Sequence, residues 1–363
     1  MRRPGESPRG PAPAEPVEGL VEAAAEAFED GRAEDALARA EEAIGVAPRS
    51  VAALHYRAAA LAELGRIEDA RAAYERALQA GKDDVDVVAG AADFLVNGLP
   101  EDDAAREDLE AGLALARRGT RLARKAGDPE LVAELAWLEG AALNQLGRCA
   151  EALERLAAAG HEAPERVDVL LEKGFALYEL CRFDEARVAL LAAEALDPDE
   201  PWTQHYLGLV AERRADAEES RRRFARARKL APEEFPRPIA LSPEAFDAAV
   251  EDALADLPEC VRSYLANVAI AVEELPSDED LLASAPPLSP AILGLFRGAP
   301  YGQKASMDPW SHFPSSIVLY QRNLERFARS RPELIEQIGV TLIHEVGHFL
   351  GLDEDELYAR GLE

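Results

Sequence analysis

A repeated step of about 34 residues runs through the first two thirds of the chain and limits its fold more than any other feature. A glycine followed five positions later by an alanine occurs at Gly31 and again, one step further, at Gly65. The pattern returns at Gly147, and one step after it Cys181 takes the glycine's place. The same spacing separates a set of prolines, Pro164, Pro198 and Pro232. A period of this length predicts stacked helical hairpins, each made of two amphipathic helices and a tight turn.

These residues resemble the tetratricopeptide repeat. The resemblance includes small residues where the two helices of a hairpin approach closely, at Ala43, Ala77, Gly140, Gly174 and Gly208. We expect repeats to begin near Val17, Val51, Ala133, Val167 and Pro201. Residues 85–132 fit one further repeat whose loop, residues 99–108, is lengthened.

The resemblance implies an α-solenoid of about six repeats over residues 17–234, with a concave groove for a protein or peptide partner. The alternative is an array that only supports or spaces the rest of the chain. No clear basic or aromatic cluster indicates a ligand. Trp137 and Trp202 fall in first helices of repeats, where we expect them to serve packing.

Charge and composition exclude several classes of function. The chain has 363 residues and a formal net charge of −29, which argues against nucleic acid or an anionic membrane as partner. Residues 1–16 begin with two arginines but lack an apolar run, so we expect a disordered lead-in rather than a signal peptide. No apolar stretch is long enough to span a membrane. Three cysteines are too few for a disulfide framework, and we expect reduced thiols in a cytoplasmic protein.

The alanine-rich helical pattern ends at a proline-rich linker, residues 235–241, and a different domain follows over residues 242–363. Residues 246–257 predict an amphipathic helix. Residues 267–275 predict a strand with Val268, Ile270 and Val272 on one face, and residues 315–321 predict a second strand. Helices are expected from residue 325 onward. The chain is therefore predicted to be mainly α, with a solenoid followed by a small α+β domain.

The last predicted helix carries the sequence His344-Glu345-Val346-Gly347-His348. Two histidines four residues apart lie on one face of a helix, so both imidazoles can bind one metal ion. Glu345 is displaced around the helix and can act as the base that takes a proton from the attacking water. Apolar residues around the motif place it on a buried helix, although two ordinary helix histidines remain the alternative interpretation.

A catalytic zinc needs a third protein ligand. Gly351 can adopt a positive φ and end the helix, after which an acidic run returns toward the metal. In the metzincin-like pattern, which this stretch resembles, the third ligand comes three residues after the glycine, and this resemblance favours Glu354. The alternatives are Asp355, then Asp353 or Glu356, and His312 as an outside candidate.

Residues 242–363 resemble the bacterial minimal zincin-like metallopeptidase family. The resemblance rests on five stretches, residues 246–258, 267–276, 292–302, 316–328 and 340–357. It implies Zn²⁺ bound by His344, His348 and Glu354, with Glu345 as the general base. It also implies a small sheet over the active-site helix, whose edge strand, expected at residues 316–321, pairs with a peptide substrate. Tyr320, His312 and Tyr358 are candidates to stabilise the oxyanion.

These patterns together predict a cytoplasmic zinc metallopeptidase that hydrolyses peptide bonds with a metal-activated water. Its repeat array would recruit a protein or peptide. The first alternative is an interaction scaffold that carries an inactive or structural zinc site. The second is a metal-free adaptor whose histidine pair only packs. The substrate, its cleavage preference and the oligomeric state are not encoded in any recognisable motif.

Overall fold

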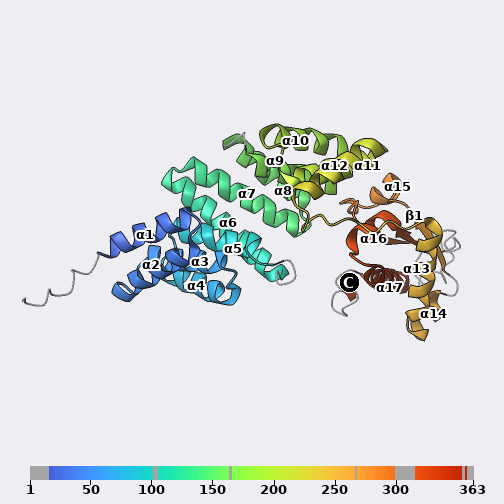
Figure 1. Ribbon diagram of the computed structural model, residues 1–363, viewed down its shortest axis with the longest axis horizontal. Coiled ribbons are helices and arrows are strands. Elements are labelled where there is room, and N and C mark those ends of the chain that lie inside the picture. Colours follow the sequence, from blue (N-terminus) through green and yellow to red (C-terminus); the bar gives the residue numbers. More distant parts are fainter. Residues whose placement is uncertain are drawn as a thin grey trace, which may run out of the picture. The chain divides into compact units, whose positions relative to one another are not determined.

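The computed structural model describes residues 16–100, 105–162, 166–265, 268–298, 315–353 and 356–357. The predicted lead-in, residues 1–16, lies outside these ranges except for residue 16. The chain forms two compact units, residues 1–176 and 177–363. Figure 1 shows a mainly helical chain with a small sheet near its C-terminal end. Within the described ranges, no helix is both long and apolar enough to cross a membrane.

Helical hairpins make up the first unit. Its helices are α1 (Val17–Glu29), α2 (Ala33–Val46), α3 (Val51–Glu63), α4 (Ile67–Ala80), α5 (Val85–Asn97), α6 (Arg106–Ala126), α7 (Pro129–Gln145) and α8 (Cys149–Glu162), and α9 (Val167–Glu179) begins in this unit. The first helices of successive hairpins contact one another, α1 with α3, α3 with α5 and α5 with α7. This continuous row of first helices is the arrangement expected of a solenoid.

The expected repeat starts agree with the helices in four cases, because α1, α3, α9 and α11 (Pro201–Arg213) begin at the predicted residues. The helix α7 begins at Pro129, four residues before the predicted Ala133. The sequence predicts that the extra residues of the third repeat, residues 85–132, lengthen its loop. This prediction is only partly correct. Much of the added length lies in α6, which has 21 residues where α2 and α4 have 14.

A residue in the left-handed conformation ends the first helix of five repeats. Three are glycines with φ near 70°, at Gly31, Gly65 and Gly147. Cys181 and Ala215, one repeat period apart, adopt the same conformation at φ 57° and 58°. The turn therefore persists in the last two repeats, where a side chain replaces the glycine, and it tolerates the strain that a Cβ brings there.

The second unit contains the last repeats and the C-terminal domain. Its helices are the end of α9, α10 (Phe183–Leu196), α11 and α12 (Ala217–Leu230), then α13 (Pro243–Asp256), α14 (Glu259–Leu265), α15 (Asp278–Leu281), α16 (Gln321–Phe327) and α17 (Arg331–Leu350). Its strands are β1 (Ala269–Glu273), β2 (Gly294–Arg297) and β3 (Ser316–Tyr320). The strand β2 and the short helix α15 are absent from the sequence-based prediction.

The three strands form one sheet in the order β1-β3-β2. The strand β3 pairs in parallel with β1 and antiparallel with β2. The expectation that residues 316–321 form the edge strand was therefore wrong, because β3 lies between β1 and β2, which are the two edges of the sheet among the described residues. The physical reason is visible in its burial, since Ile317, Val318 and Leu319 are all at most 1% exposed. A strand buried on both faces carries a continuous apolar run rather than an alternating one.

One face of the sheet packs against α17. Ile317 and Leu319 project toward this helix and join Ile338 and Leu342 in the main core of the domain. Ile270 and Val272 of β1 pack on the same core, and so does Val268, as their alternation in the sequence predicts. Phe246 of α13 completes this core at 0% exposed. The helix α17 is thus held between the sheet and α13, and the motif at its C-terminal end has a fixed position.

The turn residues give a matched pair of stability predictions. An added Cβ at Gly147 would meet no atom within 4 Å, so Gly147→Ala changes only the backbone conformation at φ 71°. We expect it to lower the free energy of unfolding by about 1 kcal/mol. Ala215→Gly relieves the same strain and should raise that free energy by about 0.5–1 kcal/mol. Urea denaturation followed by circular dichroism measures both. Shifts of the same sign in the two variants would contradict this explanation of the turn.

Candidate metal centre

The helix α17 has residues typical of helix caps at both of its ends. Ser330 is its N-cap, and the hydroxyl of this residue accepts a hydrogen bond from the backbone N–H of Glu333. The side chain of Glu333 in turn accepts a hydrogen bond from the backbone N–H of Arg329 at 2.8 Å. At the other end Gly351 adopts φ 92°, as its position after the last turn predicts. The backbone N–H groups of Gly351 and Leu352 donate to carbonyls of the last turn and close the helix.

His344 and His348 lie side by side on α17. Their Nε2 atoms are 3.1 Å apart, and their rings are nearly perpendicular, with centroids 4.8 Å apart. The Nδ1 atom of His348 is 3.1 Å from the backbone carbonyl oxygen of Leu352. A protonated Nδ1 donates to this carbonyl, which leaves Nε2 of His348 with a lone pair directed at its neighbour.

The donor geometry of this pair is suited to one zinc ion. Two nitrogens bound to a tetrahedral zinc at about 2.0–2.1 Å lie about 3.3 Å apart. The separation of 3.1 Å between the two Nε2 atoms is close to this value. The carbonyl of Leu352 supplies the hydrogen bond that metal-binding imidazoles normally make through their other nitrogen.

Glu345 is buried between α17 and the edge strand β2. The residue is 5% exposed. A Cβ built on Gly294 of β2 would lie 3.4 Å from Cγ of Glu345 and 2.6 Å from Cγ2 of Thr341. Only glycine allows the strand to approach the helix so closely. A carboxylate next to the histidine pair and under an edge strand is placed to exchange a proton with a group bound at that edge.

The chain that follows α17 returns against it beside the histidine pair. A Cβ on Gly347 would lie 2.3 Å from Cδ2 of Leu357, whose side chain is 0% exposed. The backbone N–H of Glu356 donates to Asp353 Oδ1 at 2.9 Å, and that of Asp353 donates to Glu356 Oε2 at 3.2 Å. This reciprocal pair is a capping box. Each of these two carboxylates therefore already accepts a backbone hydrogen bond.

The favoured candidates for the third ligand lie outside what the structure describes. Glu354, Asp355 and His312 all fall in undescribed segments, and so does Tyr358. Among the residues that are described, no group of three His, Cys, Asp or Glu side chains is placed to hold a metal ion. Asp353 and Glu356 therefore do not complete a site with His344 and His348 in this structure.

Tyr320 does not lie at the histidine pair, contrary to its candidacy as an oxyanion helper. Ile317 and Leu319 face α17, so Tyr320 projects from the opposite face of the sheet. Its hydroxyl is 3.5 Å from Asp280 Oδ2. Burial, reinforced by the charge of Asp280, raises the pKa of Tyr320 well above its usual value. The tyrosine thus belongs to a network on the far side, where Arg297 of β2 pairs with both Glu273 and Asp280.

The sequence analysis missed two residues that position this site, Gly294 and Gly347. Gly347 lies inside an apolar helix, where a glycine lowers helix stability and indicates a close backbone approach. That signal was available in the sequence. Gly294 carried no comparable signal, because its short strand was not recognised.

Family models match two parts of the chain. A zincin-like metallopeptidase model matches residues 265–362, and a tetratricopeptide repeat model matches residues 143–212. No curated protein matches the sequence.

Two solved structures are similar to the array. The pilF protein of Pseudomonas aeruginosa is 16% identical, with a TM-score of 0.50 over 64% of this chain and 96% of that one. PilW, described as a widely conserved type IV pilus biogenesis factor, is 14% identical, with a TM-score of 0.52 over 60% of this chain and 94% of that one. At such identities the likeness concerns the fold alone. The chain thus contains a tetratricopeptide-repeat region and a domain of the zincin-like metallopeptidase family.

Proposed function

We propose that the C-terminal domain is a zinc-dependent peptidase and that the repeat array binds a protein or peptide partner for it. The observation that carries the proposal is the arrangement on α17. Two Nε2 atoms lie 3.1 Å apart at a distance suited to one zinc ion, and a buried glutamate follows the first histidine. The zincin-like family match over residues 265–362 supports the same chemistry.

In this proposal His344, His348 and one carboxylate of the acidic run hold the zinc. The bound ion would polarise the scissile carbonyl and acidify a water. Glu345 would accept the proton of the attacking water and pass it to the leaving nitrogen. The carbonyl of Leu352 would keep the His348 ring in the tautomer that exposes Nε2.

The substrate is proposed to pair with β2 rather than with β3. In the described part of the chain β2 pairs with β3 on one side only. An extended peptide can add to such an edge through backbone hydrogen bonds. The position of Gly294 against Glu345 would bring a peptide bond at this edge near the base.

Glu354 and Asp355 are the proposed choices for the third ligand, with Glu354 favoured by its spacing from Gly351. The capping box engages Asp353 and Glu356, and this supports the choice of Glu354 or Asp355 over these two residues. The packing of Leu357 on Gly347 brings both ends of the acidic run, Asp353 and Glu356, close to the helix that carries the histidines.

The first prediction concerns the base. Glu345→Gln removes the proton acceptor but no ligand, so zinc content should stay at that of the parent while hydrolysis falls by about 10²–10⁴-fold. Cleavage of a mixed peptide substrate and metal analysis by mass spectrometry measure the two effects. Glu336→Gln, at an exposed position of the same helix, is the matched control and should leave both unchanged. Equal cleavage by the Glu345 variant and the parent would refute this role. A parent that binds zinc and cleaves nothing would instead support the scaffold alternative.

The second prediction concerns the third ligand. Glu354→Gln should weaken zinc binding by more than about 100-fold in competition with a chelator, since losing a direct ligand exceeds the usual loss from a supporting partner. Asp353→Asn should retain zinc, because asparagine also caps helices well and the capping box survives. Retention of zinc by the Glu354 variant and its loss from Asp355→Asn would transfer the role to Asp355.

The third prediction uses the contact between β2 and α17. Gly294→Ala places a Cβ 2.6 Å from Thr341 Cγ2, so β2, α17 or both must shift, which changes the position of the strand relative to Glu345. We expect a loss of hydrolysis of about tenfold or more with zinc retained, because small misplacements at a reacting centre are costly. Adding Thr341→Ser removes the clashing methyl and keeps the hydroxyl that donates to the carbonyl of Gln337. The double variant should recover most of the rate. Failure of this rescue would show that the strand position does not set the activity.

A further inference from the structure

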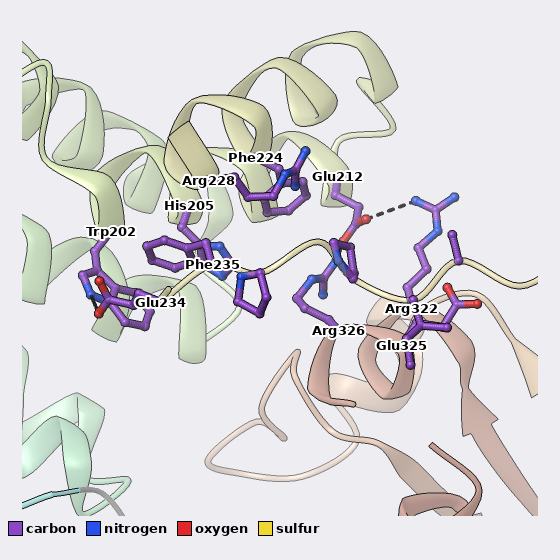
Figure 2. A pocket seen from close by; sticks show the side chains of 14 residues that line it. Trp202, His205, Glu212, Phe224, Arg228, Glu234, Phe235, Arg322, Glu325 and Arg326 are labelled. Atoms are coloured by element: carbon purple, nitrogen blue, oxygen red, sulfur yellow. Dashed lines mark hydrogen bonds and ion pairs between the residues drawn. The ribbon is translucent and has the colours of Figure 1, made fainter. Parts of the chain in front are cut away.

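A pocket of about 430 Å³ lies within the second unit, away from the histidine pair. Its walls come from α11 and α12 of the last repeat, the linker after α12, and α16. Figure 2 shows the side chains that line it, with those of α11 and α12 on one side and those of α16 on the other. The volume is in the range of pockets that hold small molecules.

Aromatic rings form the apolar wall of this pocket. Phe235 of the linker stacks on His205 with centroids 4.8 Å apart, and meets Trp202 edge-on at 4.7 Å. His205 also contacts Phe224 at 5.4 Å. Burial among these rings, with the charge of Arg326 nearby, lowers the pKa of His205 to about 3, so the imidazole is neutral at pH 7. The wall therefore offers flat apolar surfaces without a charge of its own.

The three carboxylates around the pocket already have partners. Glu212 accepts from Arg326 at 2.7 Å and from Arg322 at 3.2 Å, the second contact being drawn in Figure 2. Glu234 accepts from the indole N–H of Trp202 at 2.6 Å. Glu325 accepts from the backbone N–H of Leu241 at 2.8 Å. All three acids are therefore hydrogen-bonded, but only Glu212 has cationic partners among the described residues, since the donors to Glu234 and Glu325 are neutral.

Arg228 differs from every other arginine on α12. The others all make a hydrogen bond or ion pair, namely Arg221 with the carbonyl of Ala217, Arg222 with Glu219, Arg223 with Glu194 and Arg226 with Asp199. Arg228 lines the pocket and is half-buried, and no residue of the described ranges pairs with it. A guanidinium that lines an aromatic pocket and has no counter-ion among the described residues is complementary to an anion.

We propose that this pocket binds a carboxylate carried on a flat apolar group, with Arg228 as the counter-ion and the rings of Trp202, Phe224 and Phe235 as the apolar wall. Arginine pairs with a carboxylate through two parallel hydrogen bonds, and its fork geometry selects this planar anion. The ligand is either a free aromatic acid or the C-terminal residue of a peptide, since both present the same chemistry. The site involves none of the residues assigned to zinc.

The test compares N-acetyl-L-phenylalanine with its neutral amide, N-acetyl-L-phenylalaninamide, by isothermal titration calorimetry on the full chain. We expect the acid to bind about tenfold more tightly or better, and Arg228→Gln to remove that preference. Arg228→Lys keeps the positive charge and should retain part of the preference for the acid over the amide. Arg221→Gln makes the same charge change on the same helix outside the pocket and should bind like the parent.

Equal affinity for acid and amide, no binding of the acid in the millimolar range, or the same loss in the Arg221 and Arg228 variants would overturn the proposal. A synthetic glycine peptide ending in phenylalanine with a free carboxylate separates the two sources of ligand. Tighter binding of the peptide than of the acid assigns the pocket to protein C-termini. Weaker binding assigns it to free acids, and either result supports the role of Arg228.

Discussion

The close approach of α17 to its neighbours is the constraint on which the C-terminal domain depends. The helix meets β2 at Gly294 and the returning chain at Gly347, and in both places a Cβ would lie under 3 Å from a neighbouring side chain. Such contacts exist only because glycine has no side chain. They bring an edge strand and an acidic segment to the same end of the helix. The histidine pair lies between them. The two close backbone contacts, at Gly294 and Gly347, therefore determine what surrounds the histidines.

The same helix supplies the core of the domain, which explains why the motif can be held so firmly. Leu334, Ile338 and Leu342 are all 0% exposed, and they lie at helical spacing on the face that packs on the sheet. Glu345 continues this buried face one turn further. Burying a carboxylate lowers stability unless other interactions compensate for its lost hydration. A buried carboxylate at the end of this apolar stripe is what the proposed role of Glu345 as the base requires.

Local signals in the sequence predict the helical part of this structure well. The fixed period marks the repeats because every hairpin repeats the same turn, and the turn keeps its conformation even at Cys181. The position of Gly351 likewise predicts the end of α17. Non-local features were harder to predict. The order of the strands depends on pairing across the sheet, and the continuous apolar run of β3 was read as an edge although it indicates a central strand. The aromatic pocket joins residues from three helices and a linker, so no window of sequence contains it.

The boundary between the two compact units, after residue 176, does not coincide with the change in composition at the linker, residues 235–241. The contacts of α16 give a physical reason for this difference. Glu212 of α11 has a side chain only 9% exposed, and it depends on Arg322 and Arg326 of α16 for its counter-charges. Removing one partner of a buried ion pair is far more destabilising than removing both, because an uncompensated charge stays behind. The last repeat is thus held to α16 within one unit, although a proline-rich linker separates them in sequence. On the same short helix, Asn323 donates to the carbonyls of Pro290 and Ile292, just before β2. One helix therefore connects the last repeat to the segment that leads into the edge strand beside Glu345.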